Sequence, residues 1–253
     1  FRDKTDIRLK PLTIFVGKNS CGKSSLIRFP VVLAQTYGEE TTGVLKLYGK
    51  YLDYGNYEDI VFRHQGSSVE FSVGYRINLS LAMRRDSGLD EAPTTCYEEV
   101  VIKTTINKVD KKIIIEKNEI VVGGVLRYGL YRTNNGWNAR VFYTYDKVKK
   151  EFTSNEYSLE LNSSDVNERG FLVLVNPDMI RESVRVNLFP NIDKEDLIVK
   201  RDGMDDISIV DLIHWDFIDE PIEISDEINA YIKVASAYEY YTSMIGAIRH
   251  CYR

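Results

Sequence analysis

The amino-acid sequence predicts an α/β fold, a mixed sheet with a β-rich antiparallel insertion. Three patterns predict it: a glycine-rich segment between an apolar run and a helical pattern, alternating segments in the middle of the chain, and apolar residues three and four apart near the end. With 253 residues, 43% of them hydrophobic, the chain can bury a substantial core. We expect an N-terminal lobe over residues 1–68, the insertion over 69–176, and a mixed α/β segment over 177–253 that returns to the first sheet.

The first predicted elements are a strand and a helix on either side of the glycine-rich segment. Residues 12–16 form a largely apolar run of the kind that a buried strand gives. Residues 24–33 suit a helix packed on a sheet, and Pro30 is expected to kink it because proline lacks the backbone donor. Together they predict a strand, a tight turn and a helix in that order.

The middle of the chain predicts an antiparallel meander over residues 69–148. Gly55 and Asn56 first mark a turn, after which another element begins. The 17 tyrosines of the chain fit half-buried strands better than base stacking, because the net charge is −5. Strands are expected in the alternating or apolar segments 69–73, 100–106, 112–116, 120–122 and 140–145.

The last part of the chain predicts helices and a closing strand. Residues 207–215 are apolar at mixed spacing in a partly helical region, and residues 227–241 have helical spacing. Ser225 or Asp226 would cap the second of these helices. The run at residues 244–249 predicts one more strand entering the sheet.

The glycine-rich segment matches GxxxxGKS over residues 17–24. Glycines at positions 17 and 22 permit backbone angles that a β-carbon opposes, so successive amides can turn inward around phosphate oxygens. The start of the following helix adds the positive end of its dipole. The predicted nucleotide-binding residues are Gly17, Lys18, Asn19, Ser20, Cys21, Gly22, Lys23, Ser24 and Ser25.

The motif predicts ATP and Mg²⁺ as cofactors and indicates which residues would bind each of them. Lys23 is the predicted catalytic residue, because its ammonium would reach the β and γ phosphates. Ser24 would complete the Mg²⁺ shell through its hydroxyl, and Ser25 can add an α-phosphate contact. Gln65 is a second candidate for orienting Mg²⁺ or the attacking water, with an ordinary turn residue as the alternative.

The remaining cysteines and histidines do not predict a metal site. Cys21, Cys96 and Cys251 are odd in number and widely spaced, which fits neither a disulfide framework nor a zinc site and favours a reducing cytoplasm. Cys21 invites a redox role, but a small side chain tolerated in a backbone-binding loop is the favoured interpretation. His64 and His214 have no Cys or acidic residue at ligand spacing.

Several features of a complete ATPase are missing from the sequence. Residues 171–176 and 207–211 are the nearest candidates for an apolar strand that ends in an acidic pair, and neither supplies it. An LSGGQ-like signature is also missing. We therefore expect the first lobe of a larger ATPase that hydrolyses ATP poorly alone. No apolar run approaches membrane-spanning length, and the acidic balance disfavours direct nucleic-acid binding by this segment.

Residues 7–26, IRLKPLTIFVGKNSCGKSSL, resemble the start of the bacterial AAA family ATPases of the ABC superclass. That group includes overcoming-lysogenization-defect nucleases, RecF-like and structural-maintenance-of-chromosomes ATPases, and ATPase subunits of anti-phage systems. Residues 54–61 are similar to a short element after the first helix in standalone defence-type members. Residues 245–249 are similar to a later IGPLR strand, with Ala247 where proline is usual. The resemblance implies a P-loop NTPase fold of ABC type and a homodimer or higher oligomer that sandwiches ATP.

Four functions follow, in order of preference. The first is an ABC-type ATPase that gates a partner or fused effector, such as a nuclease or toxin in bacterial anti-phage defence. The second is a DNA-repair or DNA-maintenance ATPase of RecF or structural-maintenance type, which a long heptad pattern would favour and this chain lacks. The third is a scaffold that binds nucleotide without hydrolysis. A small-molecule kinase or GTPase is disfavoured because no NKxD element is present.

Overall fold

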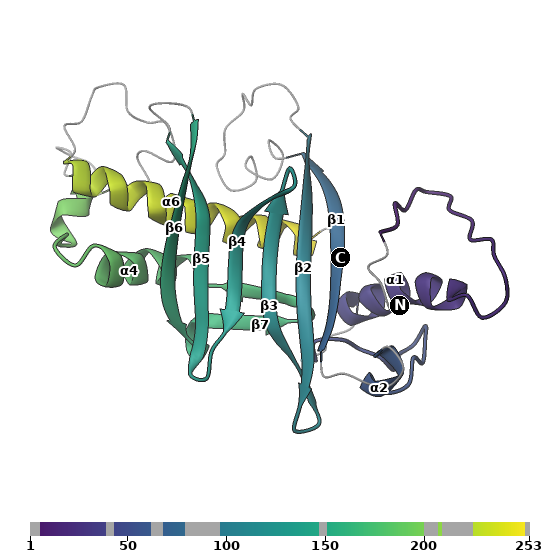
Figure 1. The fold of residues 1–253 in the computed structure, drawn as a ribbon. Helices are drawn as coiled ribbons and strands as arrows, with labels where there is room; N and C mark the ends of the chain where they lie inside the picture. Colours follow the sequence, from purple (N-terminus) through teal and green to yellow (C-terminus); the bar gives the residue numbers. More distant parts are fainter. Residues whose placement is uncertain are drawn as a thin grey trace.

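The computed structural model is a mixed α/β structure centred on a six-stranded antiparallel sheet (Figure 1). Its strands follow chain order from β1 to β6, and each pairs with the next: β1 Ser68–Asn78, β2 Tyr97–Val109, β3 Lys112–Val122, β4 Val125–Arg132, β5 Gly136–Asp146 and β6 Glu151–Asn162. The predicted antiparallel meander is therefore confirmed. The structure describes residues 6–38, 43–61, 68–78, 97–146, 151–199, 207–208 and 225–250.

The other elements are helices and short hairpins around this sheet. The helices are α1 Lys23–Gly38, α2 Tyr57–Ile60, α4 Pro177–Leu188 and α6 Asp226–His250, with short 3₁₀ turns η2 Ser163–Asp165 and η3 Glu195–Leu197. The remaining strands form two hairpins, β7 Val166–Arg169 with β8 Leu172–Val175, and β9 Ile198–Val199 with β10 Ile207–Ser208. None of the described helices is both long and apolar enough to cross a membrane.

One face of the sheet carries the core. Alternate residues of each strand point to this face, which α4, α6 and the β7–β8 hairpin cover (Figure 1). Tyr238 of α6 is fully buried, and its hydroxyl lies 3.1 Å from the carbonyl oxygens of Ala139 in β5 and Tyr157 in β6. A single hydrophobic cluster includes residues from all three segments that the sequence predicts.

Strand β3 corrects one detail of the predicted meander. Residues 112–116 and 120–122 were expected as separate strands, because polar residues lie between them. They are one strand, with a bulge opposite Thr105 and Ile106. Asn118 faces the core, where its amide donates to Thr104 Oγ1 (2.9 Å) and to the carbonyl of Phe171 (3.3 Å). A polar residue with hydrogen-bond partners can thus lie inside a buried strand.

Helix α6 overturns the predicted closing strand. The expected helix over residues 227–241 is confirmed, and the Ser225 hydroxyl accepts from the N–H of Ile228 (3.2 Å) as its cap. Residues 244–249, expected as a strand, continue the same helix, with Met244 and Ile245 buried. A short apolar run does not distinguish a strand from a buried helix by period alone.

The N-terminal segment gives a mixed outcome. The predicted helix after the glycine-rich segment is confirmed as α1, which includes Pro30. The predicted strand over residues 12–16 is wrong: this stretch forms no strand, and Leu12, Ile14 and Val16 are 81%, 75% and 90% exposed. Strand hydrogen bonds need a second strand, and none of the described residues pairs with these.

Two other predictions concern short elements, and one of them falls partly outside the described residues. The element expected after Gly55 and Asn56 is the short helix α2. Residues 207–208, placed in a partly helical region, form β10, while the rest of the 207–215 run lies outside the described residues.

Candidate nucleotide-binding site

The loop over residues 17–22 makes a tight turn that leads directly into α1. Gly22 has φ +91°, and Ser20 has φ +59°. A left-handed backbone costs a residue with a β-carbon roughly 1–2 kcal/mol, so glycine suits position 22 and Ser20 stores local strain. At Gly17 a β-carbon would approach Cys21 Sγ to 3.1 Å, so this glycine allows the two ends of the turn to come together.

The Lys23 ammonium lies inside the turn. Its Nζ donates to the carbonyl oxygens of Gly17 (2.8 Å) and Lys18 (2.5 Å), and Cys21 Sγ lies 3.8 Å away. The backbone therefore curls around one cation, which it holds with two main-chain acceptors. A phosphate oxygen could replace these carbonyls as the acceptor, because an ammonium has three donors and forms stronger hydrogen bonds with charged groups.

The first turn of α1 adds donors beside this cation. The helix begins at Lys23, and its first backbone hydrogen bond here runs from the N–H of Leu26 to the carbonyl of Gly22 (3.1 Å). The first N–H groups of a helix have no acceptor within the helix, and they concentrate the positive end of its dipole. Ser24 and Ser25 lie in this turn and are exposed, so their hydroxyl groups are accessible.

The segment that contains the loop carries charges of one sign, which the overall composition does not reveal. The chain has net charge −5, yet no Asp or Glu occurs between residues 7 and 38. The charged residues of that stretch are Arg8, Lys10, Lys18, Lys23 and Arg28. A local cationic segment in an acidic chain attracts an anionic ligand to this end of the molecule.

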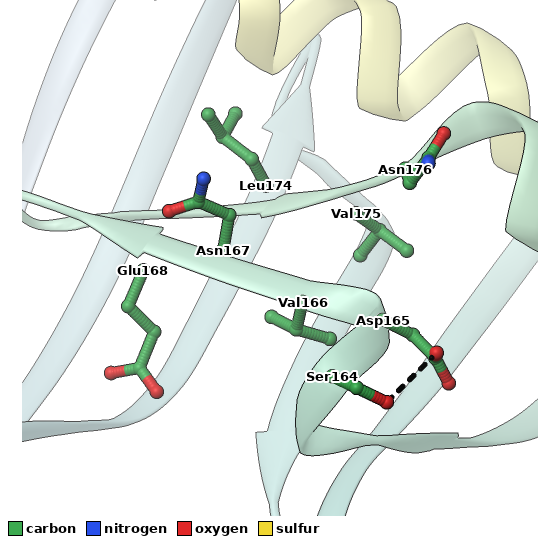
Figure 2. A pocket seen from close by; sticks show the side chains of 8 residues that line it. All are labelled: Ser164, Asp165, Val166, Asn167, Glu168, Leu174, Val175 and Asn176. Atoms are coloured by element: carbon green, nitrogen blue, oxygen red, sulfur yellow. Dashed lines mark hydrogen bonds between the residues drawn. The ribbon is translucent and has the colours of Figure 1, made fainter.

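A recess lies elsewhere, between η2 and the β7–β8 hairpin (Figure 2). Its acidic side chains already have partners within the fold. Asp165 accepts from the N–H of Asn162 (2.9 Å) and from Ser164 Oγ (3.2 Å), and Glu168 forms an ion pair with Arg132 (2.6 Å). These carboxylates stabilise the hairpin, and the recess is separate from the loop.

Several other residues that the sequence singled out cannot be compared with the loop. Gln65, His64, His214, Cys96 and Cys251 lie outside the described residues. Cys21 is a free, exposed thiol.

The described residues supply neither an acidic strand end nor a metal cluster to this site. Residues 171–175 include strand β8 and supply no carboxylate. Within the described part of the chain, no three His, Cys, Asp or Glu side chains form a group that could hold a metal ion. No protein-family model, curated protein or solved structure matches this chain.

Proposed function

We propose that this chain binds ATP through residues 17–25 and acts as the nucleotide-binding part of an ABC-type ATPase that gates a partner or fused effector. The observation that carries the proposal is the loop curled around Lys23 Nζ at the first residue of α1. A motif match alone could be a chance sequence. A turn that holds its lysine at a helix start, within a segment free of acidic residues, has the donors and the charge that a triphosphate needs.

Each part of the loop has a distinct task in this proposal. Lys23 exchanges its carbonyl partners for β and γ phosphate oxygens and offsets their charge. The amides from Lys18 to Ser24 bind the remaining phosphate oxygens, and Ser24 offers its hydroxyl to Mg²⁺. Ser24 would hold Mg²⁺ in this arrangement, and the ion would supply positive charge that stabilises the triphosphate.

The proposed role, gating an effector by ATP, rests on the resemblance of this chain to bacterial AAA family ATPases of the ABC superclass. On that basis the effector is a nuclease or toxin in anti-phage defence, and ATP binding closes an oligomer. A basic surface for DNA is not required in this role, which agrees with the acidic composition of the chain.

The binding site is tested by titrating the full-length protein with MgATP and comparing Lys23→Ala with Lys18→Ala. Lys23→Ala should weaken binding about tenfold or more, because hydrogen bonds to charged groups contribute roughly 1.5–3 kcal/mol each. The matched control Lys18→Ala removes an exposed cation of the same loop but keeps its backbone amide, so affinity should fall much less. Equal affinities for wild type and Lys23→Ala would rule out the site.

Turnover by the full-length protein then separates an ATPase from a scaffold. If the wild-type protein hydrolyses ATP steadily and Lys23→Ala abolishes this activity, the result supports the gating ATPase. Tight binding of MgATP without hydrolysis identifies instead a scaffold that is controlled by nucleotide binding alone.

A further inference from the structure

Residues 47–54 form a small hairpin, called here the 47–54 hairpin. Tyr48 and Asp53 form an isolated antiparallel bridge, and the N–H of Tyr54 donates to the carbonyl of Leu47 (2.8 Å). Tyr48 and Tyr51 of this hairpin are 73% and 65% exposed. The hairpin thus presents two aromatic side chains to solvent on a backbone that is itself ordered by hydrogen bonds.

Two buried polar side chains of α1 hold this hairpin. Thr36 Oγ1 accepts from the N–H of Lys46 (2.9 Å), and Gln35 Nε2 donates to the carbonyls of Lys46 and Leu52, the latter at 3.3 Å. A β-carbon on Gly49 would lie 2.9 Å from Gln35 Oε1, so the hairpin backbone lies directly against the glutamine. Hydrogen bonds from buried side chains are costly to break without replacement, so these bonds hold the hairpin against α1.

The other end of the same helix is the nucleotide loop. α1 is a single helix from Lys23 to Gly38, and Gln35 lies about 18 Å from Lys23 along it at 1.5 Å per residue. Phe29 and Tyr37 attach the helix to the rest of the protein through edge-to-face contacts with Phe71 and Phe171. The helix is therefore tied to the sheet by side-chain packing and to the hairpin by hydrogen bonds.

We infer that α1 couples nucleotide binding at residues 17–25 to the 47–54 hairpin, with Thr36 and Gln35 as the positioning residues at the joint. This inference rests on the proposed function. Phosphate takes Lys23 Nζ away from the Gly17 and Lys18 carbonyls, so the first turn of α1 changes its contacts when the nucleotide binds.

The test is amide hydrogen exchange of the full-length protein with and without MgATP. In wild type, MgATP should slow exchange at residues 17–25. It should also change exchange of the Lys46 amide, directly before the hairpin, and of the hairpin amides of Gly49 and Tyr54 by about fivefold, the lower end of usual couplings between sites. Thr36→Val removes the acceptor for the Lys46 N–H while keeping the shape of the side chain. It should retain the response at residues 17–25 and lose most of the hairpin response.

Thr36→Ser is the matched control, because it keeps the hydroxyl and should restore the hairpin response. Gln35→Met provides an independent break of the joint if Thr36→Val fails to fold. A hairpin that does not respond in wild type, or that responds equally in Thr36→Val, overturns the coupling even when residues 17–25 are protected. No protection at residues 17–25 in wild type instead refutes the proposed function on which the coupling rests.

Discussion

The inner face of the six-stranded sheet and the segment before α1 contain similar residues in opposite surroundings. Ile102, Ile115 and Ile120 are almost wholly inaccessible between the sheet and the elements that cover it. Leu12 and Ile14 are mostly exposed. Each apolar side chain contributes to stability in proportion to the area removed from water, so the sheet contributes most of the free energy of folding and the loop region contributes little.

This difference separates stability from ligand binding along the chain. Substitutions in the sheet should lower the free energy of unfolding with or without ligand. Substitutions in the loop should change nucleotide affinity while the fold persists. The following predictions test that separation, starting with the largest expected effect.

Trp137→Ala should give the largest loss of stability. Trp137 is almost fully buried in β5, and the Arg132 guanidinium lies 4.4 Å from its ring centroid. Removing a buried aromatic side chain costs about 3–5 kcal/mol, measurable by urea unfolding. Leu12→Ala is the control from the other region and should stay within about 0.5 kcal/mol of wild type. If Leu12→Ala lowered the free energy of unfolding as much as Trp137→Ala does, the two regions would not differ in their contribution to stability.

Gly22→Ala should affect binding more than folding. Its φ of +91° is unfavourable for alanine by roughly 1–2 kcal/mol, so the turn must change and MgATP affinity should fall about tenfold. Gly38→Ala, at the exposed end of α1 with no atom within 4 Å of an added β-carbon, is the control. If titrations find equal affinities in these two variants, the loop conformation is not what binds the nucleotide.

Tyr238→Phe should weaken the contact between α6 and the sheet by about 1 kcal/mol, since it removes the buried hydroxyl that donates to the carbonyls of Ala139 and Tyr157. Burial raises the pKa of Tyr238 above its ordinary value of 10.0. The neutral form is therefore favoured in the folded state, so this contribution is present below pH 10 and is lost as pH rises and the unfolded chain ionises. Unfolding curves at neutral and alkaline pH should show the cost of Tyr238→Phe shrinking above pH 10.

Glu182→Gln should have the smallest effect, below about 1 kcal/mol, because the Glu182 side chain is 44% exposed and solvent screens its charge. The hydrogen bond from Arg185, 2.9 Å from the carboxylate, is the main cause that lowers the pKa of Glu182 below its ordinary value of 4.5. Its stabilising contribution is complete above that value and disappears as pH falls through the lowered folded-state pKa. If Glu182→Gln lowered the free energy of unfolding equally in strong acid and at neutral pH, the ion pair could not be the cause of that loss.

Local patterns were sufficient for the elements whose interactions lie close together in the chain. The glycine-rich turn, the helix after it and the Ser225 cap depend on neighbouring residues, and the meander depends on hairpins between consecutive strands. The same patterns were insufficient at residues 12–16 and 244–249. Both runs are apolar, and only their neighbours in space decide between an exposed segment, a strand and a continued helix.

The sequence by itself determined the residues of the loop, their charge and the antiparallel order of the central sheet, because each is encoded over short spans of chain. Only the tertiary structure decided that Asn118 hydrogen-bonds within the core, and that Gln35 and Thr36 contact the backbone of residues 46 and 52. In these arrangements, side chains bind partners that are far away in the chain. The periodicity of the sequence does not specify such partners. Packing selects such partners, because a buried polar group must find a hydrogen bond somewhere in the folded chain.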